Sequence, residues 1–192
     1  MSDVLPPQDQ IDEFVGSAHG DLNRVQEMLT AFPALLTAAA VWGETAIEAA
    51  AQTGRVDIAE YLLAAGAPLS ICTAAMLGRA EEVQAYLAAD PSAAHARGAH
   101  GIPALYHAVI RGHQAIAERL LAAGADVNAD EGGSPALHGA VLFRQRAMVE
   151  WLLAHGANVN AKNRDGKTSL KVAAQNNLTE MADLLRRRGG AE

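Results

Sequence analysis

The stretch GIPALYHAVIRGHQAIAERLLAAGADVN, Gly101–Asn128, decides the fold of this 192-residue chain. It reads as a turn, a short helix, a second turn at Gly112, a longer helix and a Gly-Ala-Asp exit. In the longer helix, Ile116, Leu120 and Leu121 recur at i, i+4 and i+5, which places them on one face. The stretch therefore predicts a helix–turn–helix pair whose apolar face needs a neighbour.

Weaker copies of this stretch lie on both sides of it. The residues at the turn between the two helices are Gly20, Gly54, Gly78, Gly112, Arg144 and Asn177, and the spacings between them are 34, 24, 34, 32 and 33. Pairs of leucines followed by Gly-Ala recur with the same phase, for example Leu152-Leu153 before Gly156-Ala157. Four of the five spacings indicate a repeat protein with a period near 33, in which each helical pair stacks on the next.

The starts of the first helices carry a motif. They read GETAIEAA from Gly43, GIPALYHA from Gly101, GSPALHGA from Gly133 and GKTSLKVA from Gly166, which resemble the T-P-L-H-x-A signature of ankyrin repeats. The chain resembles the ankyrin-repeat family, and bacterial ankyrin-repeat proteins in particular, over nearly its whole length. The resemblance implies an all-α solenoid of stacked helix–turn–helix pairs with short β-hairpin fingers.

Six repeats can be drawn, at about 10–42, 43–70, 71–100, 101–132, 133–165 and 166–192, and they make one domain over residues 10–192. Residues 1–9 are expected to be an N-terminal tail, because they lack periodicity and Pro6-Pro7 blocks a helix.

The sequence departs from the family pattern in two ways. The 24-residue spacing between Gly54 and Gly78 predicts that the finger between the second and third repeats is missing, which leaves a notch. Pro103 and Pro135 stand where the family has threonine, so the hydroxyl that ties the turn to the helix is absent there, although His138 keeps the family's histidine place.

Composition narrows the function classes. The net charge of −7 and the pI near 5.5 disfavour nucleic acid as a partner, because an acidic surface repels phosphate. No apolar run approaches the roughly 20 residues that span a bilayer, so no membrane contact is expected. The start shows no secretory signal and Cys72 is the single cysteine, which fits a reducing compartment. We expect a soluble cytoplasmic protein.

The expected partner site follows from the resemblance, which implies binding at the finger tips and at the inner-facing ends of the first helices. These places carry apolar residues in the middle repeats. The predicted partner-binding set on the concave face is Trp42, Met76, Leu77, Ile102, Tyr106, Ile110, Arg111, Leu142 and Phe143. Contiguous exposed apolar surface is typical of a partner site, and the missing finger is expected to widen access to Met76 and Leu77. The alternative is that these residues pack under their own fingers or fill the space of the missing one.

Neither catalysis nor metal binding is expected. His95, His100, His107 and His113 fall within nineteen residues, but their spacing matches no ligand motif. Cys72 lies in an apolar run, which indicates a buried structural thiol rather than a nucleophile. No catalytic constellation or phosphate-cradling loop occurs, so no cofactor, no metal and no enzymatic activity are predicted.

The predicted function is therefore a non-enzymatic protein–protein interaction module, a scaffold or regulator, which binds another protein on its concave face as a monomer. Two alternatives stay open. One is a small-molecule or metal-binding domain at the notch or at the histidine cluster, which a deep pocket lined by Met76, Leu77, Tyr106 and Phe143 would favour. The other is a structural protein that associates with itself through the apolar stripe.

Overall fold

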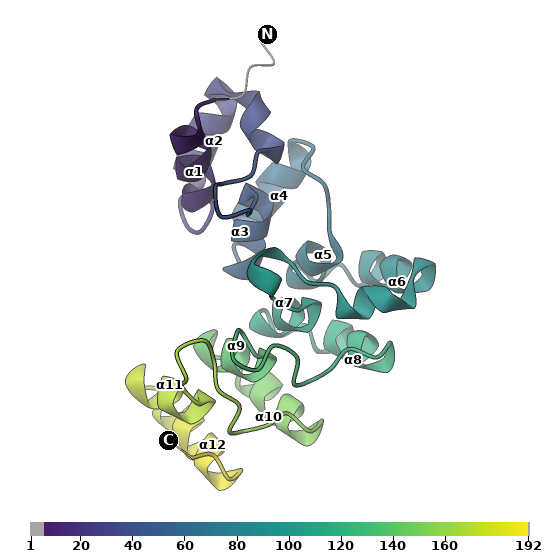
Figure 1. The fold of residues 1–192 in the computed structure, drawn as a ribbon. Helices are drawn as coiled ribbons and strands as arrows, with labels where there is room; N and C mark the ends of the chain where they lie inside the picture. The colour runs from purple at the N-terminus through teal and green to yellow at the C-terminus, as the bar shows by residue number, and fades with distance from the viewer. Residues whose placement is uncertain (1–5, 192) are drawn as a thin grey trace.

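The computed structural model describes residues 6–191, and these form a curved stack of paired helices (Figure 1). The helices are α1 (Gln8–Ser17), α2 (Leu22–Ala31), α3 (Ala46–Gln52), α4 (Val56–Ala64), α5 (Ile71–Leu77), α6 (Ala80–Ala89), α7 (Ala104–Ile110), α8 (Gln114–Ala122), α9 (Ala136–Leu142), α10 (Arg146–Ala154), α11 (Ser169–Gln175) and α12 (Thr179–Arg187). Short 3₁₀ helices lie at η1 (Pro33–Thr37), η2 (Pro91–His95) and η3 (Ala99–Gly101). The expected all-α stack of helix–turn–helix pairs is confirmed.

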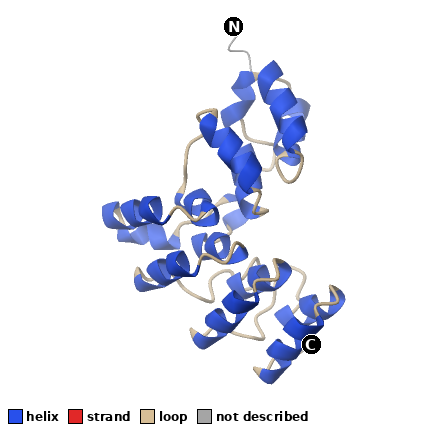
Figure 2. Ribbon diagram, turned by 180° about the vertical axis from the view of Figure 1, so that it is seen from behind, coloured by secondary structure: helices blue, strands red, loops and turns tan. Residues whose placement is uncertain are grey.

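The fingers are smaller than the expected β-hairpins, and no strand occurs in the described residues (Figure 2). Single antiparallel bridges join Ala39 to Thr45, Arg97 to Pro103 and Lys162 to Thr168. The missing finger is confirmed, because α4 ends at Ala64 and α5 already begins at Ile71. The loop over residues 123–135 also lacks a bridge of its own and is held instead by Gly132, whose N–H donates to the Lys162 carbonyl at 2.7 Å.

The N-terminal boundary is corrected by the structure. Helix α1 begins at Gln8, inside the expected tail, with Pro7 at its N-cap, where the absent proline N–H costs nothing. The Gln8 amide donates to Asp12 at 2.8 Å and to the Ala39 carbonyl at 3.3 Å, which ties the helix start to the first finger. Residues 1–5 of the expected tail lie outside the described residues.

Capping explains where the first helices begin. Thr45 and Glu48 form a reciprocal capping box at α3, and Thr168 accepts from the Lys171 N–H at α11. Pro103 and Pro135 stand at the N-caps of α7 and α9 without a side-chain cap, as the sequence predicts. His138, at the family's histidine place, has its Nε2 2.8 Å from the Lys167 carbonyl of the following finger.

Side chains at the turns also link consecutive repeats. At three turns, the side chain of the residue after the turn residue donates back to a carbonyl of the preceding repeat: Arg55 to Gly20, His113 to Met76 at 3.0 Å and Gln145 to Ile110 at 3.1 Å. At the third repeat Arg79 pairs with Glu60 instead, with its Nη2 2.6 Å from Oε2. At the last repeat the corresponding residue is Leu178, which has no donor.

The stack bends where the second finger is missing. In Figure 1 the axes of α1–α4 lie above and at an angle to those of α5–α12. The apolar core is accordingly in two parts, one shared by the last four repeats and one formed by α1–α4. The second part also includes Met76, Ile102, Tyr106 and Ile110 from the third and fourth repeats. Among the described residues no helix is both long and apolar enough to cross a bilayer.

Candidate functional site

Four residues of the predicted partner set are buried. Met76 and Ile110 are fully enclosed, and Ile102 and Tyr106 are nearly so. The alternative interpretation, in which the apolar stripe packs inside the protein, therefore holds for these four. The expectation that the missing finger widens access to Met76 and Leu77 is wrong for Met76, which is fully buried, and Leu77 is half-buried.

The turn of the second repeat supplies much of this cover. A Cβ built on Gly54 would lie 3.3 Å from Arg111 Cδ and from Phe143 Cε1, and 3.7 Å from Ile110 Cδ1. Gly54 thus packs against residues of the fourth and fifth repeats rather than only against the third. The Gly54 turn therefore covers part of the surface that is predicted to bind a partner.

Tyr106 is buried for a second, local reason. A Cβ on Gly139 of the next repeat would lie 2.6 Å from Tyr106 Cε2 and 3.1 Å from Ile110 Cγ2. The tyrosine ring therefore fills the space that a side chain at residue 139 would need. Burial raises the pKa of the Tyr106 hydroxyl to about 12, which suits a packing role.

A buried carboxylate joins the N-terminal repeats to the third repeat. Glu44 is 0% exposed. It accepts hydrogen bonds from Trp42 Nε1 at 2.9 Å and from Gln52 Nε2 at 2.5 Å. The Nε2 atoms of His19 and His100 each lie 3.5 Å from its Oε2. We call these five residues the Glu44 cluster. It gives Trp42 a structural contact, although the indole remains 45% exposed.

The predicted site keeps an exposed remainder. Leu142, at the end of α9, is 47% exposed. Arg111, which follows α7 in the preceding repeat, is also exposed. Leu77 and Phe143 are half-buried. Leu142 occupies the same place in its repeat as Ile110, two residues before the turn residue, but the residues that the structure describes leave it 47% exposed.

Three of the four clustered histidines, His100, His107 and His113, have different partners. The ring of His107 is buried, and its Nδ1 lies 3.0 Å from the Pro103 carbonyl. His113 binds the Met76 carbonyl, and His100 belongs to the Glu44 cluster. Burial lowers the pKa of His107 to about 4, so this imidazole is neutral at pH 7. Within residues 6–191, no group of three His, Cys, Asp or Glu side chains can hold a metal ion.

Cys72 is the buried structural thiol that the sequence predicts. Burial raises its pKa to about 12, with a smaller contribution from the charge of Glu48. A thiol with so high a pKa has almost no thiolate at neutral pH and is a poor nucleophile.

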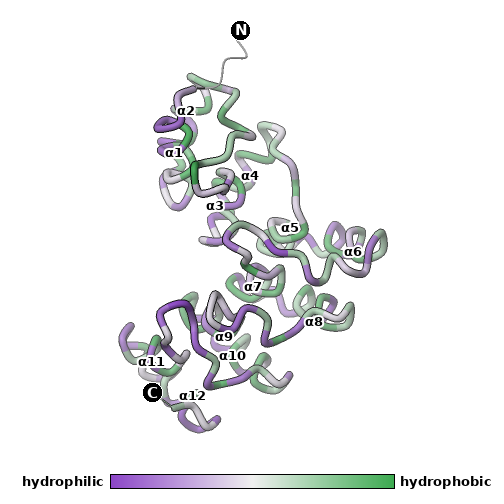
Figure 3. Tube along the Cα trace, viewed as in Figure 1, coloured by the Kyte–Doolittle hydropathy of each residue, from purple (hydrophilic) through white to green (hydrophobic). Residues whose placement is uncertain are grey.

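Charge is divided unevenly along the stack. Residues 1–132 carry six Lys and Arg against 17 Asp and Glu, a net charge of −11, whereas residues 133–192 carry nine against five, a net charge of +4. Six of these nine cations form no ion pair with any described residue: Arg144, Lys162, Arg164, Lys171, Arg187 and Arg188. Figure 3 shows the accompanying hydrophilic residues in purple along the loops of the C-terminal repeats. The last two repeats are thus a basic end on an acidic protein.

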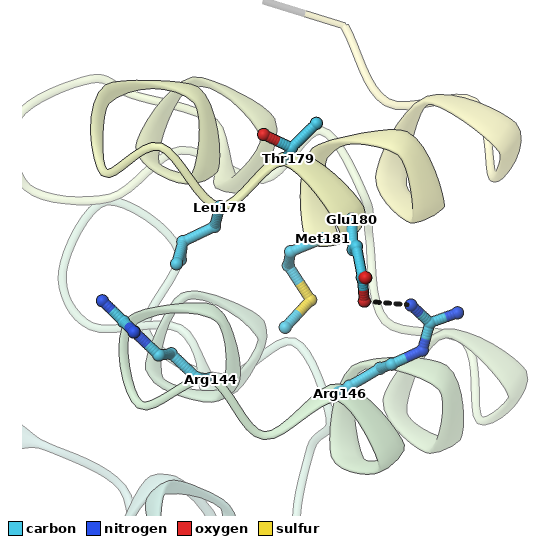
Figure 4. A pocket seen from close by; sticks show the side chains of 6 residues that line it. All are labelled: Arg144, Arg146, Leu178, Thr179, Glu180 and Met181. Carbon is cyan, nitrogen blue, oxygen red and sulfur yellow. Dashed lines mark ion pairs between the residues drawn. The ribbon is translucent and has the colours of Figure 1, made fainter.

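A pocket of about 230 Å³ opens between the fifth and sixth repeats. In Figure 4 the side chains of Leu178 and Met181 point into it, and Arg144 and Arg146 lie on opposite sides of its mouth. Arg146 pairs with Glu180 across the rim, with Nη1 and Oε2 3.5 Å apart, whereas the exposed Arg144 forms no ion pair in the described part of the chain. The arrangement combines an apolar floor with positive charge at its edge.

Sequence reasoning did not identify this pocket, although it left a signal. Leu178 stands where Arg55, His113 and Gln145 provide polar links between repeats. An aliphatic residue at that place predicts a junction without the side-chain-to-carbonyl link, and it also predicts apolar surface at the turn. Leu142 does not line the pocket, but it precedes the lining residue Arg144 by two residues in the sequence.

Comparison with known families agrees with the fold. A family model described as ankyrin repeats (3 copies) matches residues 71–163, and one described as ankyrin repeats (many copies) matches residues 145–186. A model of the single ankyrin repeat matches residues 42–74. A search of curated proteins finds no match.

Proposed function

Since the chain belongs to the ankyrin-repeat family, whose repeats are generally protein–protein interaction modules, we propose that it is a non-enzymatic module that binds a partner protein. The proposed binding surface is the exposed inner surface around Leu142, at the basic end of the stack. Its members from the predicted set are Leu142, Phe143 and Arg111.

One observation carries this proposal. The equivalent residues Met76 and Ile110 are fully buried, but Leu142 is 47% exposed at the end of α9. An exposed apolar side chain at an inner-facing place, in a part of the chain with a net positive charge, has the chemistry of an interface core with a polar rim. The rigid stack also supports binding, because little conformational entropy is lost when a preorganised surface meets its partner.

The alternative of a small-molecule domain at the notch has less support. Met76 and Tyr106, which would line such a pocket, are buried by side-chain packing. The pocket at the last repeat, at about 230 Å³, is below the roughly 300–1,000 Å³ typical of small-molecule sites. A pocket of that size suits one or two side chains of a protein partner.

The test compares two exposed apolar residues. Leu142→Ser and Phe32→Ser remove side chains of similar exposure, 47% and 44%, from different parts of the stack. Tagged wild-type protein and both variants are used to capture proteins from the native cell, and the captured proteins are quantified by mass spectrometry. We expect a protein that wild type and Phe32→Ser retain and that Leu142→Ser loses. Equal capture by all three, or capture of nothing by wild type, would refute the proposal.

A further inference from the structure

The pocket at the last junction lies where the side-chain-to-carbonyl link of three earlier junctions is absent. At three earlier junctions, a side chain from Arg55, His113 or Gln145 donates to a carbonyl of the preceding repeat and spans the gap between turns. Leu178 takes that place at the last junction and cannot donate. The space between the turns therefore stays open, with Leu178 and Met181 as its floor.

Arg144 holds a backbone conformation that favours glycine. The corresponding turn residues Gly54, Gly78 and Gly112 have φ values of 68°, 77° and 74°, and Arg144 has φ 58°. A non-glycine residue in this left-handed region is strained, and such strain is found preferentially where a side chain has a function. At this turn position three other repeats have glycine, whereas the fifth repeat has an arginine.

The charges identify the kind of ligand. Arg144 has no anionic partner in the described chain, and the last two repeats carry the net charge of +4. Arg146 already meets Glu150 at 3.2 Å and Glu180 at 3.5 Å, so Arg144 is the guanidinium left to bind an external anion. Guanidinium pairs well with carboxylate, and the apolar floor adds affinity for an aliphatic or aromatic side chain.

We propose that this pocket binds an acidic segment of the partner protein, with a carboxylate at Arg144 and an apolar side chain on Leu178 and Met181. This inference rests on the proposed function, because it specifies the chemistry of the partner that would bind at the basic end of the stack, where Leu142 also lies. Nucleic acid fits less well, since the net charge of −11 on residues 1–132 repels a long phosphate backbone and no aromatic residue lines the pocket for base stacking.

The probe is a fluorescein-labelled peptide of about twelve residues composed of Glu, Asp and Leu, measured by fluorescence anisotropy at low salt. Matched peptides replace the acids by Gln and Asn, or Leu by Ser, and a single-stranded oligothymidine of similar length tests phosphate. We expect the acidic Leu peptide to bind and its affinity to fall as the salt concentration rises. The affinity should also fall when either the acidic residues or the leucines are replaced. Amide shifts of isotope-labelled protein should move at residues 142–146 and 178–181.

Three variants separate a binding role of Arg144 from a structural one. Arg144→Gly should leave the melting temperature unchanged or raise it, because glycine relieves the backbone strain. The same substitution should weaken the affinity for the acidic peptide about tenfold. Arg144→Lys should retain most of the binding. Arg119→Gln removes an exposed arginine from α8 and should leave binding within about twofold, since only weak long-range electrostatics are lost.

The outcomes against the proposal are specific. No binding of the acidic peptide, equal binding of its Gln/Asn form, or unchanged binding by Arg144→Gly each overturns it. Tighter binding of oligothymidine would assign the surface to nucleic acid instead. Dimers in light scattering that Arg144→Gly dissociates would assign it to the acidic repeats of a second copy. If Leu142→Ser still loses a captured protein while the peptide fails, the proposed function stands and only this partner chemistry is wrong.

Discussion

Ile110 and Leu142 end the first helices of successive repeats at equivalent places, but the bend covers one and leaves the other in solvent. Ile110 lies in the core beneath Gly54, and Leu142 is 47% exposed. The same residue class at the same repeat position therefore has two roles. Burial, which the repeat pattern does not specify, decides which role each one has.

This difference predicts opposite results for two alanine substitutions. Ile110→Ala should lower the free energy of unfolding by about 2–5 kcal/mol, because it removes buried methyl groups and leaves a cavity. Leu142→Ala should change it by no more than about 0.5 kcal/mol. Urea unfolding followed by circular dichroism measures both. Comparable losses would show that Leu142 is part of the core and that the proposed surface is a packing surface.

His107 makes stability depend on pH. Its pKa is about 4 in the folded protein and about 6.5 when unfolded. As pH falls below about 6.5, His107 is protonated in the unfolded chain, whereas in the folded protein it stays neutral until about pH 4. Stability should therefore fall across this window, by an amount on the order of 3 kcal/mol, and then level off for this group.

The measurement for His107 is urea unfolding at several pH values between 7.5 and 4. His107→Gln should be less stable at pH 7 but should show a smaller loss on acidification than wild type. The exposed His155, replaced by Gln, is the control and should keep the wild-type pH slope. An unchanged slope in His107→Gln would mean that other groups cause the acid sensitivity.

At the scale of elements, the Glu44 cluster determines how α1–α4 meet the third repeat. Glu44→Ala would leave the Trp42 indole N–H and the Gln52 amide without their acceptor, which costs about 1–3 kcal/mol. Hydrogen exchange should accelerate in α1–α4 and remain unchanged in α9–α12.

A surface acid serves as the control for this experiment. Glu60 pairs with Arg79 but its side chain is 46% exposed, so Glu60→Ala should cost at most about 1 kcal/mol. Exchange that accelerates uniformly along the whole chain in Glu44→Ala would contradict a local role for the cluster at the bend.

The helical pairs could be predicted from sequence because local residues encode them. Turn glycines, leucine pairs and N-terminal prolines fix each pair, and the short Gly54–Gly78 spacing marked the missing finger. The burial of Met76 and Ile110 could not be predicted in this way, since it depends on a bend that brings Gly54 onto later repeats. Gly139 was a local signal for the burial of Tyr106, and Leu178 was one for the pocket.

At the scale of the whole molecule, the bend and the charge distribution act together. The Gly54 turn, in the acidic N-terminal repeats, packs on Ile110, Arg111 and Phe143, and the basic last repeats lie at the opposite end of the stack (Figure 1). Of the partner surface predicted over the whole concave face, the part that we propose is therefore the C-terminal part around Leu142, which remains exposed. Long-range electrostatic attraction would favour acidic partners at that end.

The most direct test of the central claim, that a partner binds around Leu142, is site-specific photo-crosslinking in the native cell. A benzophenone amino acid is placed at residue 142 or, as control, at residue 32, both of which are exposed. We predict a discrete crosslinked protein from residue 142 that is absent from residue 32 and is lost when Arg144→Gly is added. Crosslinks from residue 32 alone, or identical crosslinks from both positions, would contradict the account.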